Sequence, residues 1–193
     1  MKFKTFLAGC LGGLLSLNSC TNSPDMTDYA AYVNPFIGTG GHGHTFPGAI
    51  VPHGMISPSP DTRIDGWDAC SGYYYADSTI NGFSHTHLSG TGCCDYGDVL
   101  LMPTVGEQKY LPTGSQSQQM AYASAFSHQN ETAEPGYYSV FLDTYQVKAE
   151  LTASKRAAIH RYTFPESRIH PRLGLQSATA DQQRDGNRGH QPH

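Results

Sequence analysis

The sequence predicts an all-β fold, an antiparallel β-sandwich, and three observations lead to this prediction. Short β-prone segments separated by turn-length gaps occupy residues 136–165. Glycine and proline, 21 and 12 of the 193 residues, interrupt the chain too often for helix interiors. No stretch in the first half keeps a 3.6-residue apolar period over three turns.

The N-terminal residues predict an address signal rather than part of the fold. Two lysines precede an apolar stretch, 6–17, that is too short to span a bilayer but suits a secretory signal. The run LNSC resembles a bacterial lipobox, and plain secretion is the alternative. We therefore expect residues 1–20 to be a lipoprotein signal, with Cys20 lipidated, residues 21–31 to be a tether, and the protein to be exported to the periplasm or cell surface.

The predicted strands lie late in the chain. The run DVLLMPTVG predicts a buried strand, and GYYSVFLD, YQVKAELTAS and AAIHRYTFP predict a meander of antiparallel strands. Val147, Ala149 and Leu151 alternate with polar residues, so they should share the core face. We expect the sandwich domain to occupy residues 32–166. Residues 167–193 lack strand-like alternation and are expected to form a disordered tail.

Charge and cysteine content narrow the function classes. With 12 Lys+Arg against 16 Asp+Glu there is no basic stripe, which excludes a nucleic-acid partner. After the signal, Cys70, Cys93 and Cys94 remain. Export permits disulfides, and adjacent cysteines bond each other only with strain. Either Cys70 pairs with one of the other two, or all three are free thiols.

Two His-x-His pairs suggest a metal site as one possibility. Residues two apart in a strand point the same way, so each pair can present two imidazoles to one metal ion. The spacing matches no structural zinc signature, and histidines in Gly/Ser loops also line polar clefts. The candidate ligands are His42, His44, His53, His85, His87, Cys93 and Asp95.

The segment RIDGWDACSGYYYAD has the composition of a sugar-binding surface. Trp67 is the single tryptophan, and it lies beside Asp65 and Asp68 and before three tyrosines. An aromatic face can stack on a sugar ring while carboxylates bind its hydroxyls. The alternative is that these aromatic residues belong to the core and edge of the sandwich.

A glycosidase also needs two carboxyl groups, about 5–9.5 Å apart, across the scissile bond. The pairs Asp65 with Asp68 and Asp95 with Asp98 are the local candidates. Their spacing does not distinguish them from ordinary turn aspartates, so the residues alone name no catalytic pair.

Three segments together resemble glycoside hydrolase family 92. They are YVNPFIGTGGHGHTFPGAIVPHGM, the stretch from SPDT through GWDACSGYYYADSTINGFSHTHLSGTGCCDYGDVLLMPTVG, and EPGYYSVFLDTYQVKAELTASKRAAIHRYTFP, in order between Tyr32 and Pro165. The resemblance implies an exported bacterial exo-α-mannosidase that removes terminal α-mannose, expected to be α-1,2-linked, by calcium-dependent inversion. It also implies an N-terminal β-sandwich followed by a larger helical barrel that holds most catalytic groups and calcium ligands.

By the same resemblance, this chain ends before the barrel. We expect an incomplete sandwich with no catalytic residue and no metal ligand, which is inactive without a C-terminal catalytic domain as its partner. The alternatives are a surface lipoprotein that binds α-mannoside glycans and, third, a His-rich metal-binding protein. The residues expected to line the mannose pocket are Trp67, Asp68, Cys70, His85, His87 and Asp95, backed by Gly40, Gly41, His42 and His44.

The resemblance is expected to end after YTFPES. A one-base shift of reading frame near Ser167 can replace the tail with alternating, strand-like sequence. We therefore hypothesise a frameshift in a longer mannosidase gene.

Overall fold

The computed structural model describes residues 28–63, 66–94, 96–107, 120–166 and 171–176. The expected signal peptide, Cys20 and most of the expected tether and tail lie outside these residues, as does Asp95. None of the helices in the described part of the chain has the length and apolar character needed to cross a membrane.

The described residues form short strands and single 3-10 turns, with no α-helix among them, which confirms the all-β prediction. The 3-10 turns are η1 (Tyr29–Tyr32), η2 (Trp67–Ala69) and η3 (His128–Asn130). The strands are β1 (Ser59–Asp61), β2 (Thr79–Ile80), β3 (Gly82–Ser84), β4 (Leu100–Val105), β5 (Ser124–Ala125), β6 (Glu131–Glu134), β7 (Tyr137–Leu142), β8 (Val147–Ala153), β9 (Ala158–Thr163) and β10 (Pro171–Gln176).

The predicted meander is present as the sheet β6-β7-β8-β9, in which each strand pairs antiparallel with the next. Val147, Ala149 and Leu151 are buried, whereas Lys148 and Thr152 on the opposite face are exposed. Alternation alone therefore placed the core face of β8 correctly.

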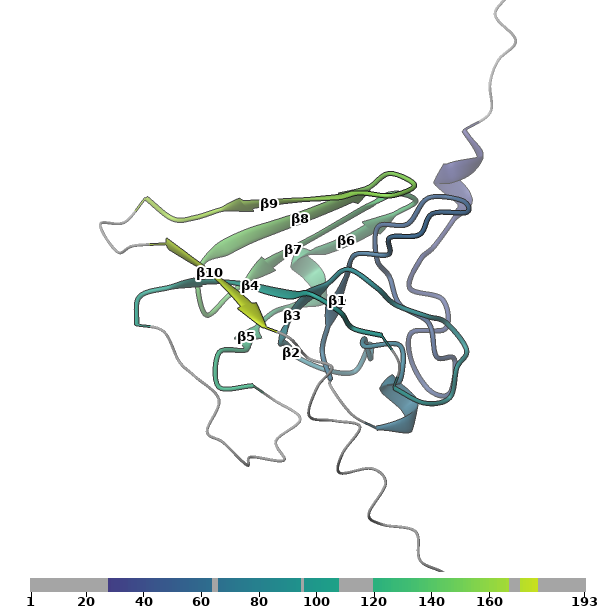
Figure 1. Cartoon of the computed structure of the whole chain (residues 1–193), viewed down its shortest axis with the longest axis horizontal. Coiled ribbons are helices and arrows are strands. Elements are labelled where there is room, and N and C mark those ends of the chain that lie inside the picture. The colour runs from purple at the N-terminus through teal and green to yellow at the C-terminus, as the bar shows by residue number, and fades with distance from the viewer. Residues whose placement is uncertain (1–27, 64–65, 95, 108–119, 167–170, 177–193) are drawn as a thin grey trace, which may run out of the picture.

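A second sheet has the order β1-β3-β4-β10, and β2 pairs with β5 in a separate ribbon. Figure 1 shows the two four-stranded sheets facing each other, with the loops that precede β4 gathered at one end of the molecule. The run DVLLMPTVG forms β4 as predicted. β10, which pairs antiparallel along β4, was not predicted.

One expected boundary needs correction. Residues 167–193 were expected to lack strands, but β10 lies within them and pairs its backbone with β4. η1 begins at Tyr29, within the expected tether, where Asp28 caps it by accepting a hydrogen bond from the Ala30 amide, and none of its residues is buried.

The core between the sheets is rich in aromatic side chains. Tyr73, Phe83 and Tyr138 are each no more than 1% exposed, and Leu142 and Val147 are fully buried beside them. Tyr73 comes from the loops rather than from the meander. The core thus fixes the loop end of the molecule against the sheets.

On the outer face of the meander, Glu150 is held by a cluster of donors. Arg161 donates two hydrogen bonds to it, at 2.7 and 2.6 Å, and the Tyr137 hydroxyl donates a third at 2.8 Å. These hydrogen bonds and the Lys148 charge lower the pKa of Glu150 to about 2.

We expect this cluster to stabilise the fold above pH 4.5 and to lose its effect as the pH falls through about 2, since the unfolded chain takes up the proton first. Glu150→Gln should reduce the acid sensitivity and cost at most about 1 kcal/mol at neutral pH, because the Arg161 side chain is 71% exposed. Urea titrations at several pH values measure this. Glu134→Gln, on an exposed position of β6, serves as the control.

Candidate functional site: an aromatic and polar rim

Two loops at one end of the sandwich form the candidate site, and we call residues 38–46 and 66–72 the rim loops. The first closes on itself, because the Thr45 amide donates to the Gly38 carbonyl at 3.3 Å. The second carries η2, whose turn closes between the Cys70 amide and the Trp67 carbonyl. Both loops are rich in glycine, which disfavours regular strands, so turn hydrogen bonds and side-chain contacts rather than sheet ladders position them.

Trp67 is the centre of the rim. Its side chain is 56% exposed although it is the largest apolar group in the chain. The His42 ring lies 4.9 Å from it between centroids, and the His44 ring meets it edge-on at 4.3 Å. These contacts hold the indole in place while leaving much of it open to a ligand.

A polar pair lies directly beside the indole. His42 Nδ1 is 2.6 Å from Asp68 Oδ1, and the two side chains are 73% and 40% exposed. This contact links the two rim loops across 26 positions of sequence. Accessible carboxylate and imidazole groups next to an aromatic face are suited to binding ring hydroxyls.

His44 supports the rim from below. It is 8% exposed, and its carbonyl accepts from the Ser71 hydroxyl at 2.6 Å and the Gly90 amide at 2.8 Å. Its Nε2 is buried without a hydrogen-bond partner in the described structure. His42 and His44 therefore take different roles, one accessible and one buried.

The tight turn of the first rim loop requires glycine at position 43. A Cβ there would lie 2.1 Å from the Gly38 carbonyl oxygen, whereas a Cβ at Gly41 would meet nothing within 4 Å. Gly43→Ala should therefore open the loop and lower the Trp67 fluorescence change on ligand binding. Gly97→Ala, outside the rim loops, is the control, because a Cβ there meets nothing within 4 Å and the residue is strained only by its positive φ of 81°. Equal behaviour of the two variants would contradict this assignment.

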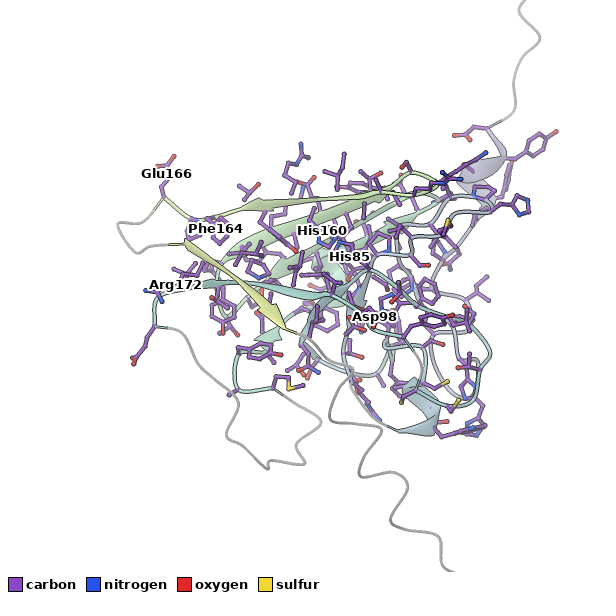
Figure 2. The ribbon with its side chains drawn as sticks, in the orientation of Figure 1. His85, Asp98, His160, Phe164, Glu166 and Arg172 are labelled. Atoms are coloured by element: carbon purple, nitrogen blue, oxygen red, sulfur yellow. The ribbon has the colours of Figure 1, made fainter. Side chains whose placement is uncertain are left out.

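The second His-x-His pair does not reach the rim surface. The His87 side chain is 2% exposed and is bonded to buried protein groups. His85 instead lies beside His160 of β9, with 4.6 Å between ring centroids (Figure 2). Burial and the nearby His85 lower the pKa of His160 to about 4. His85 and His87 lie in the loop that follows β3, not on a strand as the His-x-His pattern assumed, and they contact different neighbours.

Among the described residues, Cys70 forms no disulfide with Cys93 or Cys94, which excludes the pairing that the sequence left open. Cys70 is buried beneath the rim, where Thr91 Oγ1 lies 3.7 Å from its sulfur. Cys93 and Cys94 are exposed. Cys70 is therefore buried rather than lining the surface.

Part of the site's surroundings could not be found from sequence. A shallow pocket of about 360 Å³ adjoins the rim at Gly40. Phe36 and Tyr75 line it and meet edge-on at 5.9 Å. The segment NPFIGTG contains Phe36 but not Tyr75, and only the tertiary structure brings the two rings together. Asn34, Ile37 and Thr39 complete the lining.

Comparison with known proteins identifies the family. The glycosyl hydrolase family 92 N-terminal domain matches residues 32–190, so the match continues past Pro165, where the resemblance was expected to end. A family GH92 α-mannosidase from Bacteroides thetaiotaomicron, solved with mannoimidazole, is 50% identical, with a TM-score of 0.66, over 72% of this chain and 18% of that chain.

Two further relatives agree. The family GH92 inverting mannosidase from the same bacterium is 34% identical, with a TM-score of 0.64, over 78% of this chain and 20% of its own. A protein of Arthroderma benhamiae described as an uncharacterized secreted glycosidase is 32% identical over 141 residues, covering 72% of this chain and 18% of that protein. The chain thus spans about a fifth of the length of these relatives. It belongs to glycosyl hydrolase family 92, and its described residues are those of the family's all-β N-terminal domain.

Proposed function

We propose that the chain supplies the rim of a mannose pocket in an exported, calcium-dependent, inverting exo-α-mannosidase that removes terminal, α-1,2-linked mannose. The observation that carries this proposal is the exposed Trp67 indole flanked by His42 and Asp68. The indole can stack on the apolar face of a hexose, and the polar pair can bind its hydroxyls. The solved relatives named as α-mannosidases support mannosides as the substrate class.

Ten residues were expected around the pocket, and we expect only the accessible ones among them to contact the sugar directly. Gly40, Gly41 and His42 form the exposed turn beside Trp67 and Asp68. The buried Cys70, His44 and His87 act from beneath, and His85 faces β9. Asp95 stays a prediction, since it lies outside the described residues.

The described residues do not fit the calcium ion that the family implies. Among them, no three His, Cys, Asp or Glu side chains converge to form a possible metal site. Calcium prefers six or more oxygen ligands, and the rim offers the single carboxylate of Asp68. The metal content of the dialysed protein, measured by inductively coupled plasma analysis, tests the alternative of a His-rich metal-binding protein.

We also propose that the chain by itself does not hydrolyse mannosides. Inversion needs an acid and a base on opposite faces of the sugar, with carboxyl groups about 6.5–9.5 Å apart. Of the carboxylates near the rim, Asp68 is bonded to His42 and Asp61 is buried against His87. Release of nitrophenol from nitrophenyl α-mannoside by the purified chain with calcium would contradict this proposal.

A titration with methyl α-mannoside, followed by Trp67 fluorescence, tests the rim directly. We expect saturable binding with a dissociation constant of roughly millimolar order, because one wall of a pocket provides few contacts. Methyl α-galactoside, which differs in hydroxyl orientation, is the matched control. No mannoside-dependent change up to about 100 mM, equivalent to less than about 1.5 kcal/mol of binding, would reject the proposal.

A second candidate function is a mannoside-binding surface lipoprotein without catalysis. The same rim supports it, and the secreted Arthroderma relative supports export. Lipid attachment at Cys20 is a proposal from the sequence. Mass spectrometry of the membrane fraction, compared with Cys20→Ala, decides whether the chain is acylated.

A further inference from the structure

His87 lies beneath the rim with both ring nitrogens bonded. Nδ1 is 2.7 Å from the Ser57 carbonyl oxygen, and Nε2 is 2.9 Å from Asp61 Oδ1 and 3.0 Å from Ser84 Oγ. The His87 and Asp61 side chains are 2% and 8% exposed. A polar cluster this deeply buried must have its donors and acceptors matched.

This geometry favours a doubly protonated imidazole. A backbone carbonyl only accepts, so Nδ1 carries a proton, and an ionised carboxylate only accepts, so Nε2 carries one as well. The other Asp61 oxygen accepts from the Ser84 amide at 2.9 Å, which favours its ionised form. His87 and Asp61 therefore form a buried ion pair.

The ion pair touches both rim loops. A Cβ at Gly72 would lie 2.4 Å from Asp61 Oδ1 and 3.0 Å from His87 Cδ2, so the second rim loop packs its backbone directly on the pair. The Phe46 ring, from the first rim loop, lies 5.0 Å from the His87 ring.

A hydrogen bond beside Gly72 also joins the two rim loops. Ser71, next to Gly72, donates to the His44 carbonyl at 2.6 Å. His44 in turn meets the Trp67 indole. A short path of direct contacts therefore runs from the ion pair to the residue at the centre of the rim.

We propose that the His87–Asp61 ion pair is the positioning element of the rim: protonated His87 holds the two rim loops together and so places Trp67 for ligand binding. This inference deepens the proposed mannoside function and rests on it for the ligand. The pair itself touches no ligand. The ion pair acts on binding only by placing the Trp67 indole.

The pair makes the rim sensitive to alkaline pH. Burial by itself lowers the pKa of His87, but the charge and hydrogen bond of Asp61, with the Ser57 carbonyl, outweigh it and raise the pKa above 6.5. The groups that face the imidazole are Asp61, Ser84, the Ser57 carbonyl and Phe46, and Tyr122 experiences the Asp61 charge. The pKa of His87 is higher in the folded chain than in the unfolded chain. The stabilisation by the ion pair is therefore complete below about pH 6.5, and it is lost as the pH rises through the pKa of the folded state.

The first experiment measures the protonation of His87 in the unmodified chain. Two-dimensional NMR of ¹⁵N-histidine-labelled protein should show both His87 nitrogens protonated at about pH 6.5, with deprotonation only at higher pH. A neutral His87 ring at that pH would overturn the inference. This measurement requires no variant to fold.

The second experiment uses iodide quenching of Trp67, the single tryptophan, between about pH 6 and 9. Because the indole is already 56% exposed, its release should raise quenching by at most about twofold. The wild type should show this rise with pH, and His87→Gln should be strongly quenched throughout. His53→Gln, which changes an exposed histidine, should behave as wild type. Far-UV circular dichroism monitors the fold.

The outcomes separate the two proposals. Quenching and NMR use no sugar, so they test the positioning role even if mannoside binding fails. Where mannosides bind, His87→Gln should lose affinity about tenfold at pH 6.5, and the wild type should lose it only at alkaline pH. Identical pH profiles of quenching in wild type and His87→Gln would overturn the inference.

Discussion

Glu131→Ala is expected to lower the free energy of unfolding by about 3–5 kcal/mol, since it removes the acceptor of a buried polar cluster. The Glu131 side chain is 1% exposed and accepts from the hydroxyls of Tyr73 and Tyr138, the latter at 2.7 Å. His128 Nδ1 lies 2.6 Å from its other oxygen. Burial and the Glu131 charge raise the pKa of both tyrosines, so they remain donors.

Without the carboxylate, two buried hydroxyls and one imidazole nitrogen lose their partner, and each buried unsatisfied group costs about 1–3 kcal/mol. Urea unfolding followed by circular dichroism measures the change. Glu131→Gln, which keeps an acceptor oxygen, should lose less. Glu134→Ala, at an exposed position of the same strand, should change stability by less than about 0.5 kcal/mol. An unchanged urea midpoint in Glu131→Ala would show that the cluster contributes nothing.

Trp67→Ala is expected to weaken methyl α-mannoside binding by at least about 2 kcal/mol, roughly thirtyfold, because it removes the exposed aromatic face of the rim. Since the variant lacks its fluorophore, saturation-transfer NMR of the sugar provides the measurement. Stability should change little, because the side chain is 56% exposed. Trp67→Phe should retain part of the affinity.

Tyr29→Ala is the matched control, since it removes an aromatic side chain that is 76% exposed in η1, outside the rim loops. It should bind as wild type. Equal affinities of Trp67→Ala and wild type would place the sugar elsewhere, and the pocket lined by Phe36 and Tyr75 would then be the next surface to test.

Strand segments with a clear two-residue alternation could be predicted from the sequence. β8 and β9 follow predicted runs whose alternation places one face inward, and β7 follows a run of β-prone residues. β1, β2, β3 and β5 have two or three residues each, too few for a period to be visible. They exist because distant segments supply their hydrogen-bond partners.

The candidate site shows the same division. The sequence alone determined the all-β class and the family, because residue type and order carry that information, and it predicted Trp67, Asp68 and His42 as residues of the pocket. Only the tertiary structure decided that His87 is buried against Asp61 and that His85 turns toward His160. Two histidines that differ by two positions look equivalent in sequence, but their roles depend on which distant carboxylate, carbonyl or ring lies opposite. Those partners are brought there by packing between the sheets and the loops.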